Sequence, residues 1–184
     1  MSRPANTWTE WTYSEYARFP DDGDRYEVID GEVLVTPAPG TQHQRVAFRL
    51  ITLLQAYVSA HGLGEMLWDV DLLFVEGQFL RPDMLFVPTS QAHRATDRGM
   101  EGVPGLIVEV QSPSSVSIDR VKKPRRYRDF GVPEYWVVDP VERAVLVWRF
   151  AQGATEPETA LEWLHWSPDP SLAPVRRAVA ALFA

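Results

Sequence analysis

The chain has 184 residues, 45% of them hydrophobic and 23% charged, which is enough for one domain with a sizeable core and excludes wholesale disorder. It contains no cysteine, so disulfide frameworks, cysteine-ligated metal centres and thiol nucleophiles are excluded, and the cytoplasm is the expected compartment. The net charge of −7 argues against a protein that coats nucleic acid through its overall field.

The N-terminal segment predicts a short helix followed by a β-hairpin. Thr12 and Glu15 have the spacing of a capping box, which opens a helix through about Phe19. Two strand-like runs within residues 26–35 flank Asp30-Gly31, a pair that tolerates the positive φ angles of a two-residue hairpin loop.

A long helix and two strand segments are expected next. Apolar residues recur at helical spacing between Thr41, the expected N-cap, and Gly62, the expected C-terminal cap. The runs 66–75 and 79–87 predict two antiparallel strands, and the polar segment 88–104 predicts a surface loop.

Three further strands indicate the fold class. Residues 106–110 form a short apolar run, typical of a strand covered on both faces, and predict the centre of the sheet. Residues 134–139 and 144–150 predict two strands joined by a tight turn. We therefore expect an α/β (α+β) fold, with a mixed β-sheet flanked by helices and an N-terminal β-hairpin.

The whole chain, residues 1–184, is expected to form a single domain, because no linker or repeat divides it. Its core is expected over about residues 12–150. Residues 151–184 predict an extension with an edge strand over 160–166 and a terminal helix over 173–184.

Two carboxylates lie in apolar strand segments, where a charge loses hydration unless a cation or hydrogen-bond donors compensate. Glu109 interrupts an aliphatic run, and Asp83 follows Pro82, which implies a strand edge or a bulge. Two carboxylates aimed at one point are what Mg²⁺ requires, with water and phosphate oxygens completing its ligands. The alternative is a pair of structural salt bridges.

Positive charge concentrates in the segment from Arg120 to Arg128. A lysine there can orient an attacking water and offset negative charge on a phosphate. From the residues alone, Lys122 and Lys123 are nearly equal candidates, and the simpler alternative is that both are solvated. Because proline favours the first helical position, Pro124 predicts that Lys123 caps a helix whose free amides help to bind one phosphate.

Five tryptophans invite an interpretation as base-stacking platforms, but core packing is the expectation, because two of them lie in strand patterns with aliphatic neighbours. These five are Trp68, Trp136, Trp148, Trp163 and Trp166, of which Trp136 and Trp148 have the aliphatic neighbours.

Short motifs occur in a fixed order along residues 12–150: Tyr26–Glu32, Pro37–Pro39, His43–Arg45, Pro82-Asp83, Val108–Ser115, Asp119, Lys123, Tyr127 and Gly131–Trp136. This order resembles the Uma-two family of restriction-endonuclease-like proteins, within the PD-(D/E)xK nuclease superfamily. The resemblance implies a mixed sheet flanked by helices. It also implies an acidic pair and a lysine that bind Mg²⁺ or Mn²⁺ and cleave phosphodiesters.

The resemblance implies catalytic roles for four matching residues. Asp83 and Glu109 correspond to the metal-binding acidic pair. The usual lysine two residues later is absent and Gln111 stands there, so Lys123 of the following helix is expected to take its place. Glu27 resembles an additional acidic residue that extends the water network of the metal, and an exposed strand carboxylate is the alternative.

Other residues are expected around this set. His43 opens the long helix in the family's usual place, where a supporting role is favoured over a general base. Gln111 can hydrogen-bond the same water, although an amide cannot replace the charge of a lysine. Four basic residues are expected to contact backbone phosphates, namely Arg120, Lys122, Arg125 and Arg126.

The favoured function is a Mg²⁺- or Mn²⁺-dependent endonuclease acting on nucleic acid, with DNA as the expected substrate. The main alternative is a non-catalytic module of the same fold that binds nucleic acid or protein, and a third option is hydrolysis of a small phosphodiester. Related nucleases often pair to cut both strands, so a homodimer is compatible with the resemblance. No membrane partner is expected, because no segment is long and apolar enough to cross a bilayer.

Overall fold

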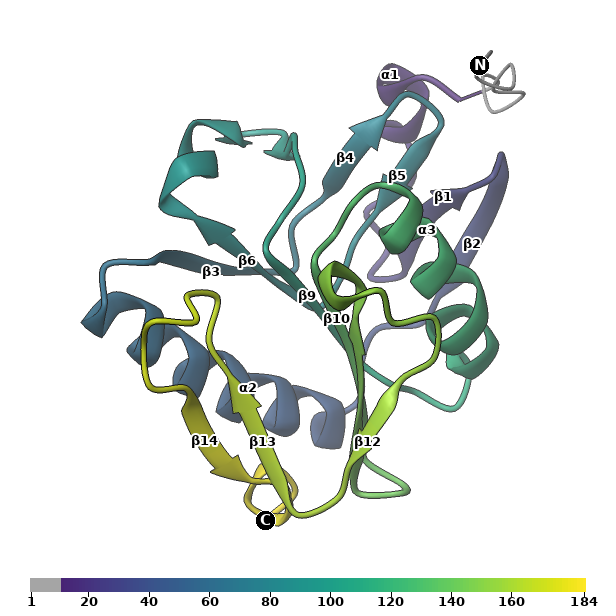
Figure 1. Cartoon of the computed structure of the whole chain (residues 1–184). Helices are drawn as coiled ribbons and strands as arrows, with labels where there is room; N and C mark the ends of the chain where they lie inside the picture. Colours follow the sequence, from purple (N-terminus) through teal and green to yellow (C-terminus); the bar gives the residue numbers. More distant parts are fainter. Residues whose placement is uncertain (1–10) are drawn as a thin grey trace.

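Two six-stranded β-sheets and a small two-stranded sheet organise residues 11–184, the part of the chain described by this computed structural model (Figure 1). The strand order is β2-β1-β5-β4-β8-β7 in the first sheet and β12-β11-β10-β9-β6-β3 in the second, and β13 pairs with β14. The helices and strands, in chain order, are α1 (Tyr13–Tyr16), β1 (Arg25–Ile29), β2 (Glu32–Thr36), α2 (Thr41–Ala60), β3 (Gly64–Trp68), β4 (Leu72–Val75), β5 (Gln78–Leu80), β6 (Met84–Pro88), β7 (Ala95–Thr96), β8 (Gly99–Met100), β9 (Leu106–Val110), α3 (Lys123–Asp129), β10 (Glu134–Asp139), β11 (Ala144–Arg149), β12 (Glu158–Ala160), β13 (Trp163–Trp166) and β14 (Val175–Ala178).

Strand β9 lies in the middle of the second sheet, parallel to β10 and antiparallel to β6, and all five of its residues are buried. Helix α2 packs on one face, where its residues Val46, Leu50 and Leu54 join a core with Val108 of β9. The α3 side carries a second core that includes Ile107. The expected mixed sheet flanked by helices, with β9 at its centre, is confirmed.

The N-terminal hairpin and the long helix also form where they were expected. Asp30 and Gly31 have φ angles of +59° and +78°, which match the turn between β1 and β2. The capping box at Thr12 is present, but α1 ends at Tyr16, before Phe19. Helix α2 begins at Thr41 with Gly40 as its N-cap, so the expected capping role of Thr41 is wrong.

Each of the two predicted strands over 66–75 and 79–87 is split between two sheets. Strands β3 and β6 pair in the second sheet, whereas β4 and β5 pair in the first. The chain leaves β3 at Asp69, which has a φ of +54°, and it returns through Pro82, which cannot donate a ladder hydrogen bond. Asp83 therefore lies at the crossover, next to the first residue of β6.

Two other segment predictions are corrected. Residues 88–104 are no simple loop, because a 3₁₀ helix (Thr89–Arg94) and the short strands β7 and β8 lie within them. The terminal helix over 173–184 is wrong: this segment forms β14 and a 3₁₀ turn (Val179–Leu182). Pairing with β13 overrides the helical preference of the alanine-rich end, because it lets apolar residues of both segments pack with the α2 core.

The tryptophans divide between core and surface. Trp136, Trp148 and Trp166 are buried, as expected. Trp68 at the end of edge strand β3 is 67% exposed and Trp163 is 43% exposed, so the prediction of core packing is wrong for these two.

Lys123 lies inside a continuous helical segment and does not cap it. A π-helical turn (Ile118–Lys122) leads directly into α3, and Lys123 has helical φ and ψ angles of −60° and −44°. The π turn accommodates Pro124, because proline cannot donate the hydrogen bond that a regular α-helix requires at that position. The hypothesis of a phosphate cradle made by first-turn amides is therefore wrong.

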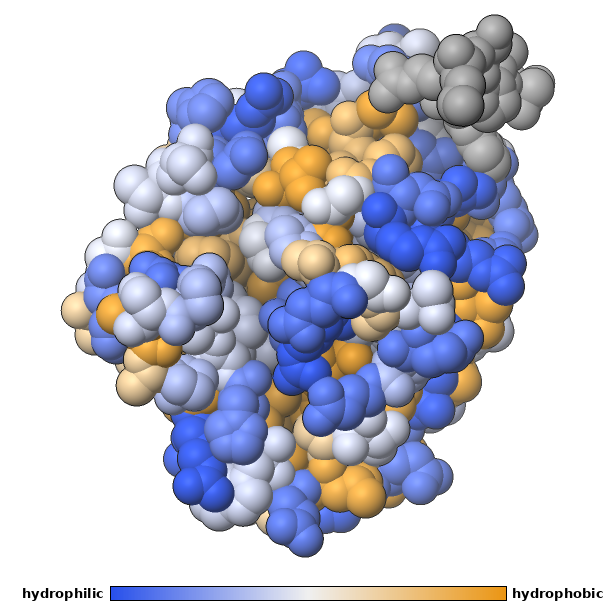
Figure 2. Space-filling model, viewed as in Figure 1, coloured by the Kyte–Doolittle hydropathy of each residue, from blue (hydrophilic) through white to orange (hydrophobic). Residues whose placement is uncertain are grey.

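Polar residues cover most of the face seen in Figure 2, interrupted by smaller hydrophobic patches. Within residues 11–184, no helix has the length and apolar character needed to span a membrane.

Candidate active site

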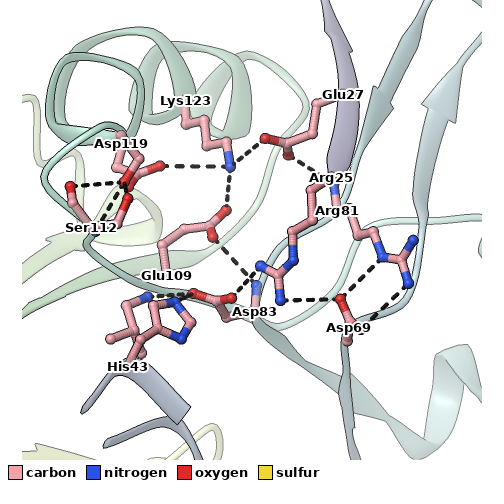
Figure 3. Close-up of polar contacts among 12 residues, drawn as sticks. Arg25, Glu27, His43, Asp69, Arg81, Asp83, Glu109, Ser112, Asp119 and Lys123 are labelled. Carbon is pink, nitrogen blue, oxygen red and sulfur yellow. Dashed lines mark hydrogen bonds and ion pairs between the residues drawn. The ribbon is translucent and has the colours of Figure 1, made fainter. Parts of the chain in front are cut away.

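The crossover before β6 brings Asp83 beside Glu109 of β9. The Asp83 amide donates to Glu109 Oε2 at 3.3 Å, and the Val110 amide donates to Asp83 Oδ2 at 2.7 Å. Both carboxylates are buried and lie on the same side of the sheet (Figure 3). The two acids that the sequence predicted as a pair are therefore neighbours, although 26 positions separate them along the chain.

The ammonium group of Lys123 points into the same site from α3. Its Nζ lies 2.8 Å from Glu109 Oε1, 3.0 Å from Glu27 Oε2 of β1 and 3.6 Å from Asp119 Oδ1 (Figure 3). Only 4% of the Lys123 side chain is exposed, so these contacts form out of bulk water. Of Lys122 and Lys123, which the residues alone could not separate, Lys123 is the one that contacts Glu109.

Burial and charge set the protonation of this cluster. Burial alone would lower the pKa of Lys123, but Glu109, Glu27 and Asp119 hold that pKa well above its usual value. Burial raises the pKa of Glu109 to about 8, and the neighbouring acids Asp119, Asp83 and Glu27 oppose its ionisation further. Lys123 is therefore a permanent cation near neutral pH, whereas Glu109 needs an additional cation to ionise fully.

Asp83 is surrounded by different partners. Its Oδ1 accepts from Arg25 of β1, and its Oδ2 lies 2.9 Å from Nε2 of His43 at the start of α2. Burial opposes ionisation of Asp83, but His43 and Arg25 lower its pKa below the usual value. Arg25 also reaches Asp69 at 3.1 Å, so it bridges two acids. Sequence reasoning missed Arg25, since nothing in its local pattern distinguishes it from an exposed strand cation.

Two other groups complete the surroundings of Glu109. Tyr127 donates its hydroxyl to Glu109 Oε1 at 3.1 Å, and Asp119 reaches Lys123 from the preceding helical turn. Both occur in the motif order along the chain, but the sequence assigned no role to either. Burial raises the pKa of Asp119, so this acid adds to the demand for positive charge.

The donor set matches what a hard divalent cation needs. Four buried carboxylates face two permanent cations in this site, and Mg²⁺ is commonly held by one or two carboxylates together with water and phosphate oxygens. Within residues 11–184, no three His, Cys, Asp or Glu side chains are already arranged as a metal site. The four buried carboxylates are those of Glu27, Asp83, Glu109 and Asp119.

A cleft of about 240 Å³ opens above these groups. The loop over residues 36–40 and the segments 112–115 and 118–119 line it. Asp83, Glu109 and Lys123 all line the cleft. A phosphate entering it therefore meets the acidic pair and the ammonium group together.

Gln111 lies away from this cluster. Its Nε2 donates to Asp139 Oδ2 at 3.2 Å, and its Oε1 accepts from Arg120. Arg120 in turn forms an ion pair with Asp139. These contacts connect the π turn to β10, so Gln111 and Arg120 have a structural role here.

The other predicted phosphate-binding residues lie on the π turn and on α3, and they do not line the cleft. Lys122 pairs with Glu32 at 2.6 Å, and Arg126 pairs with Asp30 at 2.6 Å, both across to the N-terminal hairpin. Arg125 is exposed. The structure therefore brings Asp83, Glu109, Lys123, Glu27 and His43 together, and it does not bring the four predicted phosphate contacts to that point.

Comparisons with known proteins extend these observations. The sequence matches the family Uma2, described as "Putative restriction endonuclease", over residues 13–180. It is 26% identical to the "Uncharacterized protein sll1609" of Synechocystis sp. over 133 residues, which are 70% of this chain and 74% of that protein. The fold resembles the crystal structure of "a putative nuclease belonging to DUF820" from Anabaena variabilis, with a TM-score of 0.72 and 21% identity over 94% of this chain and 97% of that chain. Because the family match spans nearly all of the sequence, the chain belongs to the Uma2 family of restriction-endonuclease-like proteins.

Proposed function

We propose that this protein is a Mg²⁺- or Mn²⁺-dependent endonuclease that hydrolyses phosphodiester bonds, with DNA as its substrate. The observation that carries the proposal is the meeting of Asp83, Glu109 and Lys123 in one cleft. Buried acids that need a cation, placed beside a fixed ammonium, suit a phosphate ester better than a neutral substrate.

Asp83 and Glu109 are the residues that would hold the ion. Glu27 and Asp119, which both contact Lys123, would orient water around the ion. A divalent ion at this site would polarise a phosphoryl oxygen and favour ionisation of water at neutral pH. The four carboxylates supply the negative charge that such an ion neutralises.

Lys123 contributes electrostatics. Its raised pKa keeps it protonated, so it stabilises negative charge that develops on the phosphate and does not act as a general base. This also accounts for the missing lysine at position 111, because the ammonium of Lys123 reaches Glu109 from α3. The absence of a lysine at position 111 is therefore no argument for a non-catalytic module.

We assign contacts with the phosphate backbone of the nucleic acid, outside the cleft, to basic residues of the 120–128 segment. Arg125 is exposed on α3, and Lys122 and Arg126 reach phosphates only by exchanging their present partners, Glu32 and Asp30. The Lys122–Glu32 pair is exposed, and exposed ion pairs contribute little stability, so its exchange costs little. We propose them as weak, sequence-independent contacts.

Cleavage of supercoiled plasmid DNA tests the proposal. We expect nicked and linear products with Mg²⁺ or Mn²⁺ and none with EDTA. Salt-sensitive DNA binding without cleavage would instead support the binding module, and turnover of model diesters alone would support a small-molecule phosphodiesterase.

The raised pKa of Glu109 predicts that ion binding releases a proton near neutral pH. Below about pH 8 the free protein holds a proton on Glu109, which the ion must displace, so affinity should fall about tenfold for each pH unit below that value. Above it, affinity should not change with pH. Titration calorimetry with Mn²⁺, in buffers of different ionisation enthalpy, measures the released proton directly.

The Glu109→Gln variant should bind Mn²⁺ more weakly at all pH values and show no step in proton release near pH 8, because glutamine has neither the charge nor the proton of Glu109. Equal proton release by the wild type at pH 7 and pH 9 would contradict the assignment of Glu109 as an ion ligand.

A further inference from the structure

A second, larger groove adjoins the cleft between α2 and edge strand β3. Its volume is about 820 Å³, within the rough 300–1,000 Å³ range of small-molecule clefts. Arg25, His43 and Asp83 line both the groove and the cleft, so the two lie side by side. A polymer whose phosphate enters the cleft would therefore have the groove as its neighbour.

Two large aromatic side chains lie open in this groove. Phe48 of α2 is 71% exposed and Trp68 of β3 is 67% exposed, although neither contributes to the core. Ile51 and Leu67 add apolar surface between the helix and the strand. Gln44, one turn before Phe48 on the same helix, is also exposed and presents both a donor and an acceptor.

The charges of the groove select bases over phosphates. Glu65 is exposed on β3, and Asp69 stands at the end of the strand. Asp69 is paired with Arg25 and Arg81, so Glu65 is the carboxylate that repels the phosphate backbone, whereas a neutral base stacks on an aromatic ring whatever its identity. The polar cleft thus suits the phosphate side of a single nucleic-acid strand, and the aromatic groove suits its base side.

We propose that this groove binds unpaired nucleobases of the strand whose phosphate lies in the cleft, with Trp68 and Phe48 as stacking surfaces. The inference rests on the proposed function and narrows its substrate to single-stranded or locally unpaired DNA. Bases inside a duplex are already stacked on their neighbours, so they offer no free face to Trp68 without leaving the helix.

Fluorescence anisotropy with two labelled oligomers of equal length tests this. One is oligothymidylate and the other is an abasic strand with the same number of phosphates, both titrated in EDTA so that cleavage cannot occur. Trp68→Ala and Phe48→Ala should each weaken binding of oligothymidylate by about 5- to 150-fold and leave binding of the abasic strand unchanged. Trp163→Ala, an exposed tryptophan on β13 outside the groove, is the matched control and should change neither.

The proposal is overturned if Trp68→Ala and Phe48→Ala weaken binding of both oligomers equally, or if they weaken binding of neither. It is also overturned if the wild type binds the two oligomers with equal affinity. Light scattering that shows a wild-type dimer and a Trp68→Ala monomer with unchanged affinity for oligothymidylate would assign the groove to a second copy of the chain. A parallel plasmid assay with Mn²⁺ separates the two claims. If the two variants weaken binding of oligothymidylate as expected but the wild type does not cleave the plasmid, the proposed nuclease function alone is refuted. If the wild type cleaves the plasmid but the variants bind oligothymidylate normally, the proposed base-binding role of the groove alone is refuted.

Discussion

Replacing Lys123 with methionine should lower the free energy of unfolding by about 3–5 kcal/mol at pH 7, the typical cost of leaving buried charges without their partner. Glu109, Glu27 and Asp119 would then face one another with no cation between them. Urea denaturation measures the loss. The loss should be smaller at pH 5, because Asp119, whose pKa burial raises, takes up protons as the pH falls and the repulsion decreases.

Lys122→Met is the matched control for this prediction. Lys122 is adjacent in sequence and also forms an ion pair, but its side chain is 44% exposed and its partner Glu32 is 62% exposed. Its loss should cost no more than about 1 kcal/mol. Similar effects for the two variants would mean that the Lys123 cluster does not hold the fold together as described.

Removing either member of the acidic pair should abolish metal-dependent cleavage. We expect Asp83→Asn and Glu109→Gln each to reduce the rate by about three orders of magnitude or more, because the ion supplies several kcal/mol of transition-state stabilisation. Each change preserves side-chain size, so the fold should persist. The measurement is plasmid cleavage at saturating Mn²⁺, with circular dichroism to confirm folding.

Glu162→Gln serves as the control for general loss of negative charge, since Glu162 is exposed between β12 and β13 and does not line the cleft. It should cleave at the wild-type rate. Retention of activity in Asp83→Asn would remove this residue from the site, even if the remaining geometry stood.

Local sequence signals predicted the elements that neighbouring residues determine. The Asp30-Gly31 hairpin, α2 and β9 follow from turn chemistry and periodicity, and all three are present. The splitting of residues 66–75 and 79–87 between two sheets was not predictable in the same way. A strand pattern indicates that a segment is extended, but it does not indicate which partner the strand pairs with.

The site shows the same division. Glu109 was recognisable because a charge within an aliphatic strand requires compensation, and Lys123 was selected only by the family resemblance. Asp119 lies four residues before Lys123, so helical spacing could have indicated their contact. Arg25 carries no such signal, because its position beside Asp83 arises from tertiary packing. The ion pair of Arg120 in the π turn with Asp139 of β10 was not predictable for the same reason, because it also arises from tertiary packing.

A crystal soaked with Mn²⁺ tests the central claim most directly. We expect one ion bound by carboxylate oxygens of both Asp83 and Glu109 at about 2.0–2.6 Å, with Arg25 displaced from Asp83. Crystals in which Arg25 stays on Asp83 and the manganese signal appears elsewhere, or not at all, would contradict it.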